Sequence, residues 1–230
     1  MNGHLTPAQP SSQETAVDDF HRQGYVLLPR VLNTEQIIAL RKAIDSHANR
    51  NNKKKGRHAV YRRVFEDHPD ICLNVFKQES VLRLVRKLIG CCGSGRMGED
   101  SGLSAHVIHN NAFRIDPGSK GQATNWHTDD PPVFITQNGK PLPKNVVVAP
   151  LVLTCMYFLN DLKTAEDGGT RVIEGSHRFG VPACDSLALQ HPAKFVQCPA
   201  GSVLIFSAHT WHSGAPVSGE SSSRYGMSFK

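Results

Sequence analysis

The segment His127-Thr128-Asp129 places a histidine and an aspartate two positions apart. In an extended segment, side chains two positions apart point to the same face, so this imidazole and this carboxylate would lie side by side. One more histidine would complete the set of two histidines and one carboxylate that binds non-haem iron(II) and leaves three coordination positions open. Asp130, the next carboxylate, would face away from His127. The triplet alone favours a hydrogen-bonded surface pair, so the metal hypothesis depends on the rest of the chain.

The second histidine is expected after an apolar segment near the end of the chain. Gly201 opens a predicted strand that runs to Phe206, and His209 and His212 follow it. His212 stands 85 positions after His127, a separation that allows two distant strands to meet in one barrel. From the residues alone, both histidines are candidates.

Arg224 stands twelve positions beyond His212 and opens the last predicted strand. Its planar guanidinium can bind a carboxylate through two parallel hydrogen bonds, as a keto diacid would require at its far end. Taken by itself, this arginine would be assigned to a surface salt bridge.

Four blocks of the sequence carry a family resemblance. They are Asn125-Trp126-His127-Thr128-Asp129-Asp130, Asp167-Gly168-Gly169-Thr170-Arg171-Val172-Ile173-Glu174-Gly175-Ser176-His177, the segment from Gly201 to His212, and Arg224. In this order they resemble the phytanoyl-CoA dioxygenase superfamily of iron(II)- and 2-oxoglutarate-dependent oxygenases. The opening Asp19-Phe20-His21-Arg22-Gln23-Gly24-Tyr25-Val26 is also typical of these proteins, so the resemblance runs from about residue 17 to the C-terminus.

The resemblance implies a fold and a set of metal ligands. The fold would be α+β, with a double-stranded β-helix (a jelly-roll or cupin-like barrel) as its core and N-terminal flanking helices. The iron(II) ligands would be His127, Asp129 and His212. The eleven positions from Gly201 to His212, and the Ser-Gly that follows, favour this histidine over His209.

The resemblance also implies contacts to the co-substrate. Arg224 would bind the far carboxylate of 2-oxoglutarate, Thr170 resembles a position that helps to hold it, and Asn125 stands where many relatives have glutamine. His177 resembles a structural residue that closes a turn. Glu174 replaces the usual proline of its block and would touch no ligand.

The implied activity is that of an iron(II)- and 2-oxoglutarate-dependent dioxygenase, with O2 as a further co-substrate and ascorbate as a supporting reductant. Hydroxylation or another oxidation is favoured over halogenation, because related halogenases have a small residue at the position of Asp129. The expected substrate is a small molecule in a biosynthetic route, and desaturation, epimerisation, ring formation and hydroxylation of a protein stay open. Two other classes also stay open: a non-catalytic jelly-roll protein that binds a metal or ligand, and a zinc site of His127, His209 and His212, which would leave Arg224 unexplained.

The elements that must position these residues fall into two groups. Helices are predicted over 18–24, 33–48, 69–77 and 80–90, with one early strand over 25–29. Short β-branched segments predict strands over 106–115, 151–159, 171–174, 195–198, 203–206 and 225–229. Helices followed by strands, without a repeat or linker, predict one α+β domain over 15–230 after a disordered tail over 1–14. Residues 130–150 are predicted as a long loop beside the site, a candidate lid.

Composition excludes several classes. The 230 residues include 39% hydrophobic and 20% charged residues and carry a net charge of +6, which is ordinary for a folded protein. The basic run over 53–57 predicts a solvated loop rather than a nucleic-acid site. Without a membrane-spanning stretch, a signal peptide or a peroxisomal address, a cytoplasmic protein is expected, whose six dispersed cysteines stay reduced. The sequence does not specify an oligomeric state.

Overall fold

The computed structural model describes residues 4–5, 13–50, 58–62, 64–90, 105–118, 125–136, 140–217 and 223–230. Its helices are α1 (Gln13–Gln23), α2 (Thr34–Arg50), α3 (Val64–Asp67), α4 (Pro69–Phe76), α5 (Glu79–Gly90), the 3-10 helix η2 (Ser176–Arg178) and α6 (Asp185–Ala188). Its strands are β1 (His4–Leu5), β2 (Tyr25–Leu28), β3 (His58–Arg62), β4 (Asn110–Ile115), β5 (Leu153–Phe158), β6 (Thr170–Ile173), β7 (Ala193–Val196), β8 (Ser202–Ser207), β9 (His212–Gly214) and β10 (Arg224–Phe229).

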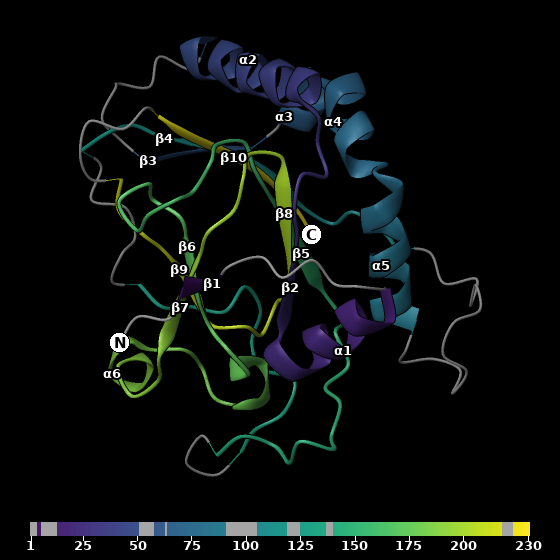
Figure 1. Cartoon of the computed structure of the whole chain (residues 1–230), viewed down its shortest axis with the longest axis vertical. Coiled ribbons are helices and arrows are strands. Elements are labelled where there is room, and N and C mark those ends of the chain that lie inside the picture. Colours follow the sequence, from purple (N-terminus) through teal and green to yellow (C-terminus); the bar gives the residue numbers. More distant parts are fainter. Residues whose placement is uncertain are drawn as a thin grey trace.

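The larger sheet has six strands in the order β2-β8-β5-β10-β4-β3, and every neighbouring pair in it is antiparallel. Helices α2, α4 and α5 lie along one side of this sheet, as Figure 1 shows. Leu40 of α2, Leu84 of α5, Leu153 of β5 and Phe229 of β10 belong to one buried apolar cluster. The helices of the first half therefore cover the outer face of the larger sheet.

The smaller sheet has the order β1-β7-β6-β9. A second apolar cluster joins Phe158 and Phe206 of the larger sheet to Val172 and Val196 of the smaller one. Two sheets thus face each other across an apolar core and form a jelly-roll barrel. The predicted fold class, an α+β chain with such a core and flanking helices, is confirmed.

Alternation along β5 decides which residues face into the barrel. Leu153, Cys155 and Tyr157 pack in the cluster beneath the helices, whereas Met156 and Phe158 pack toward the smaller sheet. Because successive side chains of a strand point to opposite faces, Thr154 shares the inner face with Met156 and Phe158. The inner face of β5 is thus available to line a site.

The predicted start of α2 is confirmed. The side chain of Asn33 accepts a hydrogen bond from the backbone N–H of Gln36 at 2.9 Å, and the Gln36 side chain accepts one from the N–H of Asn33 at 3.0 Å. This reciprocal arrangement is a capping box.

Gly201, which was predicted to open a strand, has a left-handed backbone with φ +82°. A Cβ at this position would lie 2.4 Å from the carbonyl oxygen of Leu32. Only glycine fits this entry into β8.

Three strands differ from the prediction. Within the tail that is predicted to be disordered, β1 pairs in parallel with β7, because an edge strand offers unpaired backbone groups that the tail sequence does not reveal. Strand β3, which pairs with β4, was not predicted. Strand β9 was not predicted either, because its three residues are too few to show an alternating pattern in the sequence.

The basic run 53–57 and the pair Cys91 and Cys92 lie outside the described residues. No helix in the described part of the chain combines the length and apolarity needed to cross a bilayer.

Candidate functional site

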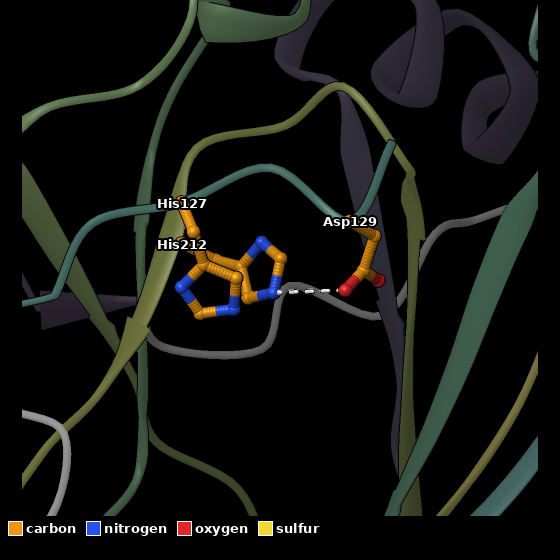
Figure 2. A group of neighbouring side chains, drawn as sticks. All are labelled: His127, Asp129 and His212. Carbon is orange, nitrogen blue, oxygen red and sulfur yellow. Dashed lines mark ion pairs between the residues drawn. The ribbon is translucent and has the colours of Figure 1, made fainter. Parts of the chain in front are cut away.

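The structure brings His127, Asp129 and His212 together. Their candidate ligand atoms, one from each residue, all lie within 4.8 Å of one another (Figure 2). His127 forms an isolated antiparallel bridge with His212, in which each backbone N–H donates to the other residue's carbonyl at 3.1 and 3.0 Å. This bridge places the two imidazole centroids 4.2 Å apart. Asp129 stands two positions after His127, so its carboxylate lies on the same face of the segment as the imidazole of His127.

Both histidines are oriented by a backbone carbonyl two positions earlier. Nδ1 of His127 lies 2.9 Å from the carbonyl oxygen of Asn125, and Nδ1 of His212 lies 2.9 Å from that of Thr210. A carbonyl can only accept, so each Nδ1 donates its proton and each Nε2 keeps a lone pair for a metal. Burial lowers the pKa of His212 to about 4, with Asp129 acting in the opposite direction. This ring is therefore neutral near pH 7, which is the form that binds metals.

The carboxylate of Asp129 has its two oxygens in different surroundings. Oδ1 lies 3.7 Å from Nε2 of His212 and 3.2 Å from Nζ of Lys230. Oδ2 accepts a hydrogen bond from the hydroxyl of Thr154 at 2.7 Å. Burial alone would raise the pKa of Asp129, but His212, Thr154 and Lys230 together lower it below its ordinary value. The residue is thus a candidate anionic ligand whose Oδ1 faces His212.

Arg224 is a buried cation that has no anionic partner among the described residues. Its side chain is 4% exposed, and its guanidinium carbon lies 4.9 Å from the ring centroid of Phe113 and 5.7 Å from that of Phe158. Nε has no hydrogen-bond partner, and among the described residues no carboxylate pairs with the guanidinium. Burial lowers the pKa of Arg224 to about 10, so it stays charged near pH 7. A buried charge is costly unless an anion binds it, so this position fits an anionic ligand.

The inner face of β5 connects this arginine with the triad. Thr154 binds the triad's aspartate, Met156 accepts a weak hydrogen bond from the hydroxyl of Thr170 at 3.3 Å, and Phe158 lies beneath the guanidinium of Arg224. From Thr154 to Phe158 the strand rises by roughly 13 Å. Thr170 and Arg224 therefore lie along one side of the barrel interior, beyond the candidate metal ligands.

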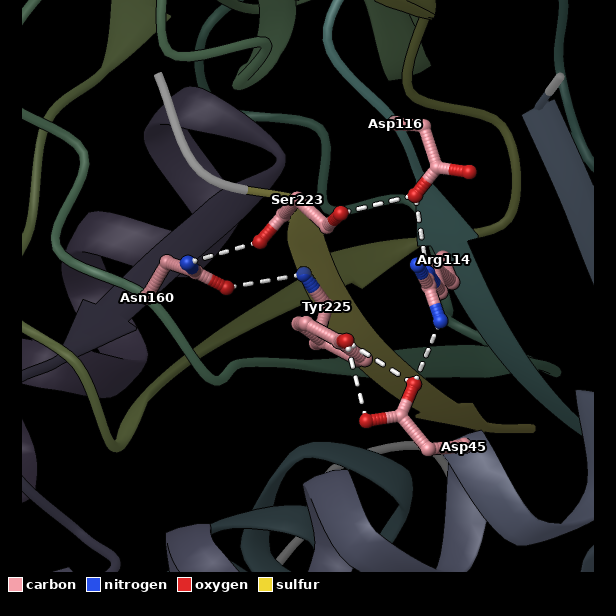
Figure 3. Close-up of polar contacts among 6 residues, drawn as sticks. All are labelled: Asp45, Arg114, Asp116, Asn160, Ser223 and Tyr225. Atoms are coloured by element: carbon pink, nitrogen blue, oxygen red, sulfur yellow. Dashed lines mark hydrogen bonds and ion pairs between the residues drawn. The ribbon is translucent and has the colours of Figure 1, made fainter. Parts of the chain in front are cut away.

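The backbone around Arg224 is held by Asn160. The amide of Asn160 donates to the carbonyl oxygen of Ser223 at 3.1 Å and accepts from the backbone N–H of Tyr225 at 2.8 Å (Figure 3). These two hydrogen bonds lie on either side of Arg224. The start of β10 is therefore fixed where the guanidinium enters the barrel.

A second group of polar contacts ties the same strand to α2 and β4 (Figure 3). The hydroxyl of Tyr225 donates to Oδ1 of Asp45 at 2.8 Å, and Arg114 donates to the same oxygen at 2.7 Å. Nε of Arg114 donates to Oδ1 of Asp116 at 2.8 Å, which also accepts from the hydroxyl of Ser223 at 2.7 Å. Both flanks of the arginine are thus anchored to neighbouring elements.

The other residues considered from the sequence lie elsewhere. Asn125 is exposed, and its backbone carbonyl rather than its side chain contacts the first histidine. His209 and Asp130, the alternative ligands, are outside the three-residue cluster. His177 is buried in η2, and its Nε2 lies 3.1 Å from the carbonyl oxygen of His21, which agrees with a structural role.

The loop over 130–150 forms neither helix nor strand in its described part, 130–136 and 140–150. Arg178 of η2 donates to the carbonyl oxygen of Leu142 at 2.5 Å, and the N–H of Thr136 donates to the carbonyl of Gly180 at 3.2 Å. The loop is therefore held to η2 and to the segment that follows it. A role as a lid stays a prediction.

Three residues of the site are not singled out by the sequence analysis. Thr154 is the single threonine in the apolar run 151–159, and this signal would have identified it. Asn160 and Lys230 carry no comparable signal, because each meets its partners only through the folding of distant strands.

The sequence matches the model of the Phytanoyl-CoA dioxygenase (PhyH) family over residues 20–226. It is also similar to the ectoine dioxygenase of Halomonas elongata, with 25% identity over 238 aligned positions that cover 92% of this chain and 65% of that protein. The chain therefore spans slightly less than two thirds of the length of this relative.

Several solved structures are similar in fold. SnoK, a non-haem, alpha-ketoglutarate-dependent carbocyclase from nogalamycin biosynthesis, has a TM-score of 0.67 and 19% identity, covering 99% of this chain and 86% of SnoK. HygX from Streptomyces hygroscopicus, solved with nickel and 2-oxoglutarate, has a TM-score of 0.66 and 15% identity, with the same coverages of 99% and 86%. The epimerase SnoN, solved with Fe3+, alpha-ketoglutarate and nogalamycin RO, has a TM-score of 0.69 and 17% identity, covering 96% and 83%. At these identities the structures establish the fold, and the family match over 20–226 confirms the expected relationship: the chain belongs to the phytanoyl-CoA dioxygenase family.

Proposed function

We propose that this protein is an iron(II)- and 2-oxoglutarate-dependent dioxygenase that oxidises a C–H bond of a small molecule. The observation that carries the proposal is the pairing of two features in one barrel. One is a cluster of two imidazoles and one carboxylate, and the other is a buried arginine that no carboxylate of the described residues pairs with. Neither feature alone would be specific for this chemistry. Together they match its two requirements, a site for iron(II) and a site for the dianion 2-oxoglutarate.

The residues of the cluster fit iron(II). His127 and His212 present Nε2, and Asp129 presents Oδ1, while the remaining polar atoms of the three side chains are already hydrogen-bonded. Such a donor set suits octahedral iron(II) with open positions, whereas structural zinc sites close with four ligands. Asp130 and His209 stand outside the cluster, so this proposal retains the three ligands expected from the sequence.

The residues at the far side fit a dicarboxylate. Arg224 would pair with the carboxylate of 2-oxoglutarate that lies farther from the iron, and the hydroxyl of Thr170 lies on the same side of the barrel. Phe113 and Phe158 exclude water around the guanidinium, which strengthens a charge-assisted contact. Asn125 is exposed, so its side chain is the weakest of the proposed co-substrate contacts.

Iron(II) and 2-oxoglutarate, when bound, couple the decarboxylation of 2-oxoglutarate to succinate with the oxidation of a substrate C–H bond by O2. The chain's own residues orient the ligands, neutralise the co-substrate and keep its pocket dry. We favour hydroxylation in a biosynthetic route, with ascorbate as a supporting reductant. Similar structures include a carbocyclase and an epimerase, so the same fold accommodates other outcomes of C–H oxidation.

The test is anaerobic binding followed by turnover. Under nitrogen, iron(II) and 2-oxoglutarate are expected to give a metal-to-ligand charge-transfer band in the parent protein. Under air with ascorbate, the parent is expected to release succinate slowly without substrate. Asp129→Ala should lose both signals, and Arg224→Met should lose them at 2-oxoglutarate concentrations that saturate the parent. A parent protein without the charge-transfer band would refute the proposal.

A further inference from the structure

Lys230 is held at the end of β10 by its backbone. Its N–H donates to the carbonyl oxygen of His109 at 2.9 Å, and its carbonyl oxygen accepts from the N–H of Ile108 at 2.8 Å. These contacts extend the pairing of β10 with β4 by one further step. Residues 224, 226, 228 and 230 share one face of β10 by alternation, so the Lys230 side chain points into the barrel, as that of Arg224 does.

Lys230 and Thr154 bind the same carboxylate from neighbouring strands. Phe229 pairs with Cys155 in the register of β10 and β5, and one further position sets Lys230 opposite Thr154. Nζ of Lys230 lies 3.2 Å from Oδ1 of Asp129, and the hydroxyl of Thr154 donates to Oδ2 at 2.7 Å. Each oxygen of this candidate ligand therefore has its own partner, a cation at one and a neutral hydroxyl at the other.

The oxygen that Lys230 contacts is also the one that would bind a metal. Oδ1 of Asp129 faces Nε2 of His212 at a distance of 3.7 Å (Figure 2). A carboxylate oxygen has two lone pairs, so Oδ1 can accept from the ammonium and bind a metal at the same time. Only this oxygen atom would then separate the ammonium from the metal.

This ammonium is a fixed positive charge in a poorly solvated place. Among the described residues, Asp129 is the only acid that pairs with it. The side chains of Lys230 and Asp129 are 19% and 16% exposed, so water and salt screen the charge less than they would at the surface. Arg224, the other cation on this face of β10, stands six positions away, roughly 20 Å along the strand.

A fixed positive charge acts differently on the two oxidation states of iron. Oxidation of iron(II) to iron(III) removes one electron and raises the charge of the site by one. The repulsion from a neighbouring ammonium grows in proportion, so it destabilises iron(III) more than iron(II). Charges and hydrogen bonds around the ligands are among the means by which proteins set the reduction potential of a metal.

We propose that Lys230, acting through Asp129, raises the reduction potential of the bound iron and so keeps it in the ferrous form. This inference rests on the proposed function, because iron(II) is the form that the proposed chemistry uses. It gives the two partners of Asp129 different tasks: Thr154 orients the ligand, and Lys230 sets the charge around it. Lys230 is thus a positioning residue, since it touches the ligand and no reacting atom.

The first experiment is a redox titration of the full chain loaded with iron alone, under nitrogen with mediators, in which EPR follows the iron(III) signal. Lys230→Met should lower the reduction potential by about 59 mV, which corresponds to a tenfold greater preference for iron(III) over iron(II). Lys230→Arg keeps the charge and should keep the potential of the parent. Lys42→Met removes a charge at an exposed position of α2 and is the control, which should also leave the potential unchanged.

The affinity for iron(II) separates this role from simple support of the ligand. Competition with a chromophoric chelator under nitrogen measures it. Removing the ammonium also removes its repulsion of iron(II), so Lys230→Met should bind iron(II) at least as tightly as the parent. Thr154→Val removes an orienting hydroxyl and should bind iron(II) more weakly. A loss of iron(II) affinity in Lys230→Met would show that the lysine supports the ligand, and it would overturn the inference.

The outcomes separate the inference from the proposed function. If the parent gives no charge-transfer band with iron(II) and 2-oxoglutarate, the oxygenase proposal fails and this inference fails with it. If the parent gives the band but Lys230→Met keeps the parent's potential, the inference alone is wrong. It is also wrong if Lys230→Arg lowers the potential as far as Lys230→Met does.

Discussion

The two ends of the candidate site are held in place by different kinds of contact. At the metal end, each histidine is oriented by a carbonyl two positions away in the chain, at Asn125 and at Thr210. At the arginine end, Asn160 binds backbone groups 63 and 65 positions away, and Tyr225 binds Asp45 across 180 positions. One end is built from local geometry, and the other depends on the folded sheet.

This difference implies that the two ends fail independently. A change at the metal end should affect the affinity for iron(II) first, because the ligands themselves lose their orientation. A change at the arginine end should leave the metal in place and affect the affinity for 2-oxoglutarate. Substitutions that keep the fold can therefore test whether the site has two separable parts.

The largest effects are expected from Asp129→Ala and Arg224→Met. Asp129→Ala should abolish iron(II) binding, whatever the concentration of 2-oxoglutarate. Arg224→Met should retain iron(II) but weaken 2-oxoglutarate binding about a hundredfold, because two charge-assisted hydrogen bonds are lost. Titrations of metal and co-substrate under nitrogen measure the two quantities separately. Equal loss of iron(II) affinity in both variants would contradict the division into two ends.

The same division explains what the sequence could predict. The spacing of His127 and Asp129 places both side chains on one face, and the family resemblance, through the distance from Gly201, favoured His212 over His209. Such signals are local, and they predicted the residues that the structure brings together. Likewise, the helix-start residues of α2 and the short apolar segment 151–159 are local patterns that predicted elements of the fold.

The contacts that the sequence could not predict are long-range. Lys230 meets Asp129 only because β10 runs the length of the barrel, and Asn160 meets the backbone around Arg224 only because β5 and β10 are neighbours. Nothing in the residues near Asn160 marks it as a partner of that arginine. Strand β1 was not predicted for the same reason, since its partner β7 lies far along the chain.

A smaller effect at the metal end is expected from Thr154→Val. This substitution keeps the shape of the side chain and removes the hydroxyl that donates to Oδ2 of Asp129 at 2.7 Å. Partners that orient a metal ligand are worth about 10- to 100-fold in metal affinity, so iron(II) should bind that much more weakly. Thr154→Ser should restore binding. A loss of 2-oxoglutarate affinity at saturating iron(II) would argue against a role confined to the metal end.

The matching effect at the arginine end is expected from Asn160→Asp. The carboxylate still accepts from the N–H of Tyr225 but no longer donates to the carbonyl of Ser223. Losing one hydrogen bond of this kind weakens 2-oxoglutarate binding about two- to tenfold, with kcat and iron(II) affinity unchanged. Asn74→Asp, the same change at an exposed position on α4, is the control.

A double-substitution cycle decides whether Asn160 acts through Arg224. In the Arg224→Met background, Asn160→Asp should have no further effect on the affinity for 2-oxoglutarate. An equal effect in both backgrounds would show that Asn160 supports the strand in general and does not position the guanidinium.

The smallest effect concerns acid stability, and it too distinguishes the ends. His177 lies behind the metal end: its Nδ1 is 2.5 Å from where a Cβ on Gly24 would stand, and the carbonyl of Gly24 accepts from the hydroxyl of Thr210. Burial lowers the pKa of His177 to about 4, and the charges of Arg178 and the neighbouring histidines act in the same direction. The six residues drawn at the arginine end include no histidine (Figure 3).

The sign of the pH dependence follows from proton binding. Between pH 6.5 and pH 4 the unfolded chain binds a proton at His177 and the folded protein does not, so the free energy of unfolding falls as the pH falls. This stability is fully present above pH 6.5, and about 3 kcal/mol of it is lost once the pH has fallen to 4. His177→Gln should therefore flatten the decline in urea-unfolding free energy between pH 7 and pH 5, whereas His106→Gln, at an exposed position, should not. An unchanged slope in a folded His177→Gln variant would show that the acid sensitivity arises elsewhere in the protein.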